Sequence, residues 1–136
     1  MIDLAERLLQ QHEGFRDRPY RCTAGKLTIG YGRNLDDVGI SREEAAYLLR
    51  QDIFRAIGDL RLEPYWLDLT EVRQAVLIDM CVNLGWPRLS RFERMRKALT
   101  EGDYGRAADE MVGSKWFLQV GARGRTLERM MRTGEV

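Results

Sequence analysis

Three side chains able to take part in chemistry lie close together near the start of the chain. Glu13, Cys22 and Thr28 are separated by eight and then five residues within the stretch EGFRDRPYRCTAGKLTIGYGR. Glutamic acid can donate a proton, cysteine can act as a nucleophile or polar group, and threonine can position water or substrate. These residue types also occur together by chance, so their value depends on how the chain positions them.

Two further side chains could join this trio. Asp17 is a possible second carboxylate, but Arg16 and Arg18 on either side of it favour a solvated loop. His12 could activate Cys22 as a Cys-His nucleophile, although its place ten residues earlier on a predicted helix disfavours that pair.

A helix is expected just before the trio. Residues 3–12 carry apolar side chains at helical spacing, and Gly14 suits the position that ends a helix. Glu13 would therefore stand at the helix end, near the edge of the apolar face. Desolvation and the negative end of the helix dipole would both favour its protonated form there.

A β-hairpin is expected next. Residues 18–35 contain short runs rich in Tyr, Thr and Ile around a turn at residues 23–26. Such a hairpin would bring Cys22 and Thr28 close together, because its turn lies between them.

Two glycines, Gly30 and Gly32, flank Tyr31 at the end of this hairpin. Glycines placed in this way mark a bend or a close approach of backbone to another group. Residues 34–39 form a polar loop that follows.

The rest of the chain has helical patterns. Ser41 and Glu44 have capping-box spacing, and the apolar spacing after them predicts a helix to about residue 60. Residues 72–84 are apolar almost all round, which predicts a buried central helix with Cys81 in the core.

The C-terminal part should contain several shorter helices. Ser90 and Glu93 have the spacing of a second capping box, which predicts a helix to about residue 99. Further helices are expected to begin near residue 103 and to cover residues 114–120 and 123–132.

Because strands are expected only in the first third, the pattern predicts an α+β fold with a small antiparallel sheet lobe and a larger helical lobe. Residues 1–136 should form a single domain. The sheet lobe would cover about residues 13–60, and the helical lobe about residues 65–136 together with the N-terminal helix.

Charge is unevenly distributed along the chain, and the histidine and cysteine content does not indicate a metal site. The net charge is +1, but residues 1–84 carry 11 basic and 14 acidic side chains, whereas residues 85–136 carry 11 and 7. A cationic second half suits an anionic partner such as bacterial wall, nucleic acid or a membrane surface, or it reflects solvated helix faces. One histidine and no Cys-x-x-Cys give no metal-site spacing.

Targeting signals are not expected in this sequence. Asp3 and Glu6 interrupt the N-terminal residues, which lack the basic leader and unbroken apolar core of a signal peptide. No apolar run approaches the roughly 20 residues that a membrane span needs. If the protein acts outside the membrane, something else must let it through.

The stretch HEGFRDRPYRCTAGKLTIGYGR resembles the active-site signature of the phage-type lysozymes, the endolysins related to the T-even phage enzyme. The family's pattern is Glu, eight residues, Asp or Cys, five residues and Thr, and the Ile-Gly-Tyr-Gly that follows also matches. The resemblance continues through ISREEAAYLLRQDI, VRQAVLIDMCVNLG, SKWF and RTGEV. The chain lacks a segment that longer relatives carry between the sheet and the next helix.

The resemblance implies a two-lobed, lysozyme-like muramidase that hydrolyses the bond between N-acetylmuramic acid and N-acetylglucosamine in peptidoglycan. Glu13 would be the general acid. Cys22, with Thr28, would orient water or stabilise the developing positive charge, work that a second carboxylate does in most glycoside hydrolases. Whether Cys22 acts as a thiolate, a hydrogen-bond partner or a nucleophile is left open by the residues.

The resemblance also implies contacts with substrate outside the trio. Tyr31 lies in the matching Ile-Gly-Tyr-Gly and is expected to contact substrate. Asn83 matches a cleft-facing amide that would bind an N-acetyl group, and a helix C-cap is the alternative role.

Two arginines match positions of the family less directly. Arg123 aligns with an arginine that pairs with the catalytic glutamate, with Arg125 as a rival and a plain surface role as the alternative. Arg33 stands where many relatives carry histidine, which would alter a structural ion pair rather than catalysis.

As a member of this family, the protein would need no metal or cofactor. It would act as a monomer on peptidoglycan glycan strands, without binding nucleic acid or inserting stably into the membrane. It would be stored in the host bacterial cytoplasm and reach the wall after release through holin lesions. A tail-associated or prophage-encoded lysozyme, a lytic transglycosylase and a non-catalytic peptidoglycan-binding module are the alternatives.

Overall fold

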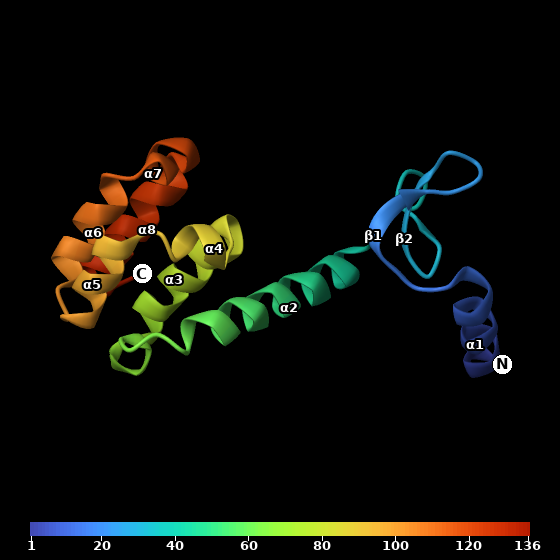
Figure 1. Ribbon diagram of the computed structural model, residues 1–136, viewed down its shortest axis with the longest axis horizontal. Helices are drawn as coiled ribbons and strands as arrows, with labels where there is room; N and C mark the ends of the chain where they lie inside the picture. Colours follow the sequence, from blue (N-terminus) through green and yellow to red (C-terminus); the bar gives the residue numbers. More distant parts are fainter. The chain divides into compact units, whose positions relative to one another are not determined.

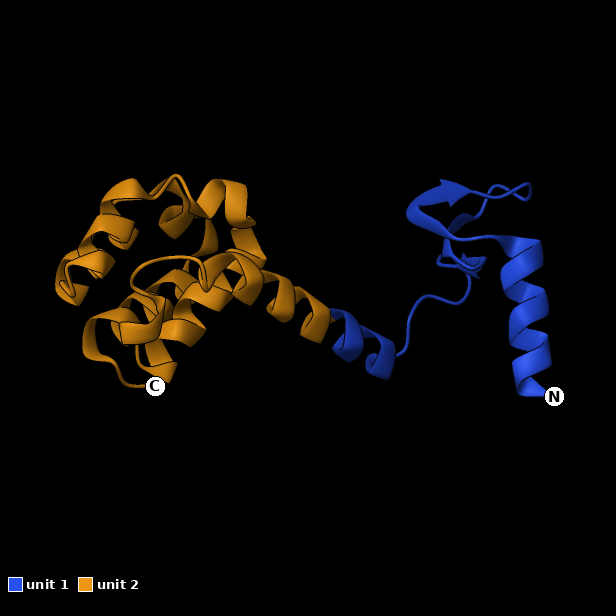
Figure 2. Ribbon diagram, turned by 60° about the horizontal axis from the view of Figure 1, so that its bottom comes forward, with its two compact units in different colours: residues 1–48 blue, residues 49–136 orange.

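The computed structural model describes all residues 1–136 and has an α+β fold, as predicted. Eight α-helices and one 3-10 helix accompany a single three-stranded antiparallel sheet (Figure 1). The chain divides into two compact units, Met1–Leu48 and Leu49–Val136 (Figure 2). Helix α2 (Arg42–Leu60) contributes its first turns to unit 1 and the remainder to unit 2.

Unit 1 contains the predicted helix and hairpin. Helix α1 (Ile2–Glu13) is followed by strands β1 (Arg16–Arg21), β2 (Leu27–Gly30) and β3 (Arg33–Asn34), which pair in the order β1-β2-β3. Residues 22–26 form the turn between β1 and β2. The helix end at Glu13 and the hairpin around Cys22 and Thr28 are therefore confirmed.

The pairing of β1 with β2 contains an irregularity. Arg16 pairs with Gly30, whereas Tyr20 pairs with Thr28, so β1 uses four steps where β2 uses two. Pro19 lies within the resulting bulge, where the proline nitrogen is not needed for the hydrogen-bond ladder.

No residue of α1 is buried in unit 1. The apolar face predicted for this helix is present, but Leu4, Leu8 and Leu9 are all exposed. Helix α1 belongs to unit 1 together with the sheet. The predicted membership of α1 in the helical lobe stays a prediction.

Helix α2 begins with the predicted capping box. The backbone N–H of Glu44 donates to Ser41 Oγ at 3.1 Å, and the N–H of Ser41 donates to Glu44 Oε1 at 2.9 Å. Two otherwise unpaired donors at the helix start are satisfied in this way.

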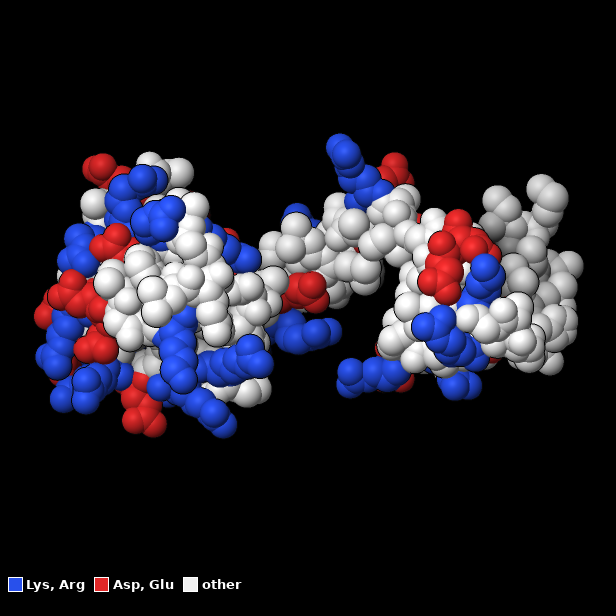
Figure 3. Space-filling view, turned by 90° about the horizontal axis from the view of Figure 1, so that it is seen from above, with Lys and Arg blue, Asp and Glu red and all other residues white.

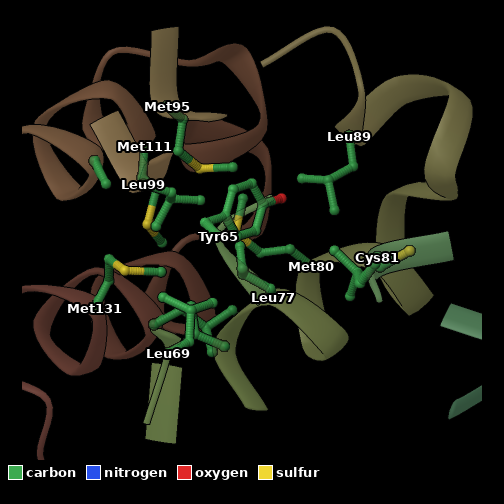
Figure 4. Packing of buried hydrophobic residues seen from close by; sticks show 14 of the residues in the cluster. Tyr65, Leu69, Leu77, Met80, Cys81, Leu89, Met95, Leu99, Met111 and Met131 are labelled. Atoms are coloured by element: carbon green, nitrogen blue, oxygen red, sulfur yellow. The ribbon is translucent and has the colours of Figure 1, made fainter. Parts of the chain in front are cut away.

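Unit 2 contains the hydrophobic core. Helix α3 (Glu71–Leu84) begins at its N-cap Thr70 and buries Val76, Leu77, Met80 and Cys81. The elements packed with it are η1 (Trp66–Asp68), α4 (Trp86–Leu89), α5 (Glu93–Thr100), α6 (Tyr104–Val112), α7 (Lys115–Val120) and α8 (Ala122–Thr133). Figure 4 shows the side chains of Tyr65, Met80, Met95, Leu99 and Met111 converging from several of these helices. The predicted buried helix with Cys81 in the core is confirmed.

The capping box predicted at Ser90 is wrong. Helix α5 starts at Glu93 after Phe92, which provides no side-chain cap. Ser90 Oγ instead donates to the carbonyl of Pro87 at 2.8 Å, because the short helix α4 ends at that point. A sequence pattern cannot distinguish a serine that starts one helix from a serine that closes the helix before it.

Basic side chains are more frequent on unit 2. Residues 85–136 contribute 11 of the 22 Lys and Arg residues, and Figure 3 shows blue side chains interspersed with red over this unit, most densely along its lower edge. None of the helices is both long and apolar enough to cross a bilayer.

Arg73 ties three helices of unit 2 together. From α3, its Nε donates to the carbonyl of Met131 at 2.8 Å and its Nη2 to that of Arg132 at 3.2 Å. Its guanidinium also lies 4.0 Å from the centre of the Tyr104 ring of α6. The last carbonyls of a helix lack intrahelical partners and carry partial negative charge, so a cation at this place stabilises the end of α8.

Replacing Arg73 tests these contacts, which together we call the Arg73 clamp. We expect Arg73→Met to lower the free energy of unfolding by about 2 kcal/mol, because charge-assisted hydrogen bonds to helix carbonyls are lost. Urea unfolding followed by circular dichroism measures the change. Arg129→Met is the matched control on α8, since Arg129 is exposed and forms no ion pair. An equal, small loss in both variants would show that the clamp contributes nothing.

Candidate active site

Glu13 is the last residue of α1, and Gly14 ends the helix with a positive φ of 68°. The Glu13 side chain is exposed and accepts no hydrogen bond within unit 1. The desolvation expected from the sequence is therefore not provided by unit 1. A carboxyl without an intramolecular partner is free to exchange a proton with a bound molecule.

The backbone at Gly32 lies directly against the Glu13 carboxyl group. A Cβ built at Gly32 would stand 2.6 Å from Oε2 and 2.7 Å from Cδ of Glu13. No real Cβ contact is that short, so a side chain at this position would collide with the acid. The close backbone approach predicted from the Gly30-Tyr31-Gly32 pattern is confirmed at Gly32.

Cys22 lies at the first position of the hairpin turn. Its N–H donates to the carbonyl of Lys26 at 2.9 Å, and its carbonyl accepts from the N–H of Gly25 at 2.8 Å. The half-buried thiol lies inside this turn, and hydrogen bonds from the backbone amides of Lys26 and then Ala24 lower the pKa of the Cys22 thiol. Donors that point at the sulfur favour its thiolate form.

Thr28 lies beside Cys22 and is only 3% exposed. Its hydroxyl donates to the carbonyl of Lys26 at 2.8 Å. A hydrogen bond with Thr28 also contributes to the lowered pKa of Cys22. A hydroxyl has one proton, so Thr28 cannot donate to both partners at once, and the amide of Lys26 is the main cause of the shift.

An ordered loop supports the hairpin from the other side. Asp36 accepts from the backbone N–H of Leu27 at 2.8 Å, and Lys26 Nζ lies 3.2 Å from Asp37 Oδ1. The N–H of Asp37 donates to Asn34 Oδ1 at 2.9 Å, which closes a local turn. The sequence pattern predicts only a polar loop for residues 34–39, and the spacing of Asn34 and Asp37 is the signal for this turn.

Arg33 joins the same loop to helix α2. Its Nη1 donates to Glu44 Oε1 at 2.8 Å and to the carbonyl of Gly39 at 3.1 Å. The Arg33 hydrogen bond, with that from the Ser41 amide, lowers the pKa of Glu44 to about 2. The structural ion pair expected at Arg33 is thus present, with Glu44 as its partner.

The remaining predicted site residues lie in both units. Tyr31 of unit 1 is half exposed, and its ring centre lies 5.6 Å from that of Phe15. In unit 2, the Trp116 indole donates to Asn83 Oδ1 at 2.8 Å, and Arg123 Nε donates to Asp79 Oδ1 at 2.8 Å.

These contacts leave the predicted roles in unit 2 untested. Gly85, and not Asn83, is the C-cap of α3. The pairing of Arg123, or of its rival Arg125, with Glu13 stays a prediction, because Glu13 belongs to the other unit.

The structure does not support a catalytic role for Asp17 or His12, the two side chains that could have joined the trio. Asp17 is solvated as expected, with 74% of its side chain exposed and a 3.9 Å contact to Arg18, but it lies in β1 and not in a loop. His12 is exposed on α1 and forms no hydrogen bond with Cys22. No group of three or more His, Cys, Asp or Glu side chains is arranged to hold a metal ion.

Comparisons with known proteins show the family of this chain. The family model described as Phage lysozyme matches residues 10–133, which include the whole trio. The chain is 32% identical over 113 residues to an endolysin of Acyrthosiphon pisum secondary endosymbiont phage 1, covering 80% of this chain and 74% of the relative.

Two more distant relatives match almost the whole chain. It is 24% identical to the pre-baseplate central spike protein Gp5 of Enterobacteria phage T4, covering 99% of this chain and 28% of that protein. It is also 24% identical to probable T4-type lysozyme 2 of Dictyostelium discoideum, covering 98% and 96%. Both alignments span 164 residues, so these relatives carry residues that this 136-residue chain lacks.

The lysozyme-type fold and these matches define the class, a glycoside hydrolase that acts on peptidoglycan. More narrowly, the chain belongs to the phage lysozyme family.

The Arg33–Glu44 pair predicts a pH dependence of unit 1. Because the pKa of Glu44 is lowered to about 2 from an ordinary value of 4.5, its contribution to stability is present above pH 4.5 and is lost as the pH falls toward 2. We expect Glu44→Gln to be less stable than the parent chain at pH 6 and to approach it at pH 2. Amide hydrogen exchange of β2 and β3 measures this difference. Glu43→Gln, one residue away without an ion pair, should show no such convergence.

Proposed function

We propose that this chain cleaves the glycosidic bond between N-acetylmuramic acid and N-acetylglucosamine, with Glu13 as the general acid. The observation that carries this proposal is the Glu13 carboxyl at the end of α1, with no partner in its own unit and with the hairpin backbone beside it. Membership of the phage lysozyme family over residues 10–133 supports the reaction class.

In the proposed reaction, Glu13 gives its proton to the glycosidic oxygen as the bond from that oxygen to the anomeric carbon breaks. The leaving sugar departs with a hydroxyl group, and the anomeric carbon becomes positively charged. A water molecule then adds to this carbon and releases a proton, and the Glu13 carboxylate takes up a proton from solvent in its place. Each product carries one of the two fragments of water, so the reaction is a hydrolysis.

Cys22 and Thr28 are proposed to serve the second half of this reaction. The turn amides lower the pKa of the Cys22 thiol and so favour its thiolate, the form that would suit a group that orients water or stabilises a cation. Thr28 is held beside it by its bond to the Lys26 carbonyl, so its hydroxyl oxygen has a fixed position. These two residues would replace the second carboxylate of most glycoside hydrolases.

Supporting roles at the site are proposed for three more residues, two in contact with substrate and one in contact with Glu13. The Oδ1 of Asn83 is taken by Trp116, so its amide protons are available to donate to an N-acetyl carbonyl. Tyr31 presents a half-exposed ring, a surface on which a sugar can pack. Arg123 is proposed to hold Glu13 electrostatically, in exchange with its present partner Asp79.

The biological setting is proposed from the relatives. The most similar of those described above is named an endolysin, which supports storage in the host cytoplasm and action on the wall after release. The match to a central spike protein keeps a tail-associated lysozyme as the alternative. We propose that the chain acts as a monomer without nucleic acid.

A lytic transglycosylase acting on the same bond is the second candidate. It is favoured by the thiol at position 22, because a transglycosylase needs one acid and no second carboxylate. The two reactions differ in their products, since hydrolysis leaves reducing ends and transglycosylation leaves anhydro ends.

Replacing the acid tests the proposed function. Glu13→Gln should abolish wall lysis, a loss of at least about 100-fold in rate, because general acid catalysis contributes roughly that much or more. Circular dichroism should show an unchanged fold. Turbidity of bacterial wall suspensions and mass spectrometry of the released muropeptides measure rate and product. Glu6→Gln on the same helix is the control, and full lysis by Glu13→Gln would refute the assignment.

Replacing the thiol tests the second group. Cys22→Ser should lower the rate of wall lysis by about 10-fold or more, because a hydroxyl does not ionise near neutral pH, while the thermal midpoint stays nearly constant. Cys22→Asp should keep most of the activity, since a carboxylate provides the same charge. Equal rates for Cys22→Ser and the parent chain would exclude a catalytic thiol.

A further inference from the structure

Gly32 differs from every other glycine of the chain in what a side chain would meet. A Cβ at this position would lie 2.6 Å from Oε2, 2.7 Å from Cδ and 3.1 Å from Cγ of Glu13. All three nearest atoms belong to a single side chain, and that side chain is the proposed acid. No other glycine would bring a Cβ against a residue of the proposed site at so short a distance.

The collision has a specific consequence. Atoms at the far end of a flexible side chain move more easily than backbone, so a methyl group at Gly32 would displace the Glu13 carboxyl rather than the hairpin. The carboxyl is exposed and has no hydrogen-bond partner in unit 1 that would hold it in place. The Glu13 carboxyl can therefore occupy its present position only because residue 32 has no side chain.

The backbone pairing explains why Gly32 meets the acid. Arg16 pairs with Gly30, and the ring of Phe15 lies 5.6 Å from that of Tyr31. The strand pairing stops at Arg16 and Gly30, and extending its register places Phe15 opposite Tyr31 and Gly14 opposite Gly32. Gly32 therefore lies beside the end of α1, where its missing side chain leaves room for the carboxyl of the adjacent Glu13.

We propose that Gly32 is a positioning residue for the reaction, because the absence of a side chain at this position leaves room for the Glu13 carboxyl to lie against the hairpin backbone, where it can protonate the glycosidic oxygen. This inference rests on the proposed role of Glu13. Gly32 itself contributes no side chain to the chemistry, so its effect should fall on the catalytic step and not on substrate binding.

Gly30 provides a matched control. Its φ of 70° is close to the 77° of Gly32, so alanine is strained at both positions to a similar degree. A Cβ at Gly30, however, would meet no atom within 4 Å. The two alanine variants therefore share a positive φ, and only Gly32→Ala brings a Cβ against Glu13.

The experiment compares Gly32→Ala, Gly30→Ala and Glu13→Gln in the full chain, with kcat and KM measured on a soluble, uncrosslinked glycan strand and thermal midpoints measured by circular dichroism. We expect Gly32→Ala to lower kcat about 100-fold relative to Gly30→Ala, the loss typical of a displacement of about 1 Å at a reacting group. KM should change less than about threefold, and the two thermal midpoints should fall equally.

Each outcome bears on the proposal. Equal kcat values for the two alanine variants would overturn it, as would a Gly32→Ala chain that fails to fold while Gly30→Ala folds, because the displaced atoms would then not be those of Glu13 alone. In a Glu13→Gln background, Gly32→Ala should have no further effect on residual kcat. If Glu13→Gln keeps full activity, the proposed function itself fails, and this result is distinct from a failure of the positioning role alone.

Discussion

The pairing of Arg16 with Gly30 is the contact on which the candidate site depends. It brings the residues after α1 beside the end of the hairpin, where Tyr31 lies by Phe15 and Gly32 lies against the Glu13 carboxyl. Side chains alternate between the faces of a strand, so a slip of one residue would change which residue of the hairpin lies beside the acid. The bulge within β1 absorbs the extra residues between Arg16 and Tyr20, which lets this contact coexist with the pairing of Tyr20 and Thr28.

Unit 1 maintains this register without a hydrophobic core. Thr28 is the only buried residue before Leu49, whereas unit 2 buries a cluster of large apolar side chains. Hydrogen bonds and ion pairs take over this role, through the Ser41–Glu44 cap, the Arg33–Glu44 pair and the bond from Leu27 to Asp36. In this network the carboxylates of Glu44 and Asp36 are occupied. Glu13 is not part of this network, and its carboxyl lies against the backbone at Gly32.

Sequence patterns predicted those parts of the structure that depend on local chemistry. The helix end at Gly14, the hairpin turn and the cap at Ser41 follow from residue types a few positions apart, and all three are present. The cap predicted at Ser90 failed because the same local pattern fits the end of α4. For Gly32 the sequence could predict only that the backbone lies close to some other group. That this group is Glu13 depends on how the hairpin packs beside the end of α1. The Arg73 clamp joins residues nearly sixty positions apart, and no local pattern could indicate it.

The thiol at position 22 illustrates how the turn compensates for a change of residue type. A carboxylate is ionised at neutral pH wherever it is solvated, but an ordinary thiol with a pKa near 8.5 is mostly neutral. The turn between β1 and β2 closes at Cys22, and hydrogen bonding from the backbone of Lys26 and then Ala24 lowers the pKa of its thiol. Backbone amides in a turn do not depend on side-chain identity, so the same turn would stabilise an aspartate carboxylate at this position. A single backbone geometry would therefore suit either a thiolate or a carboxylate at position 22.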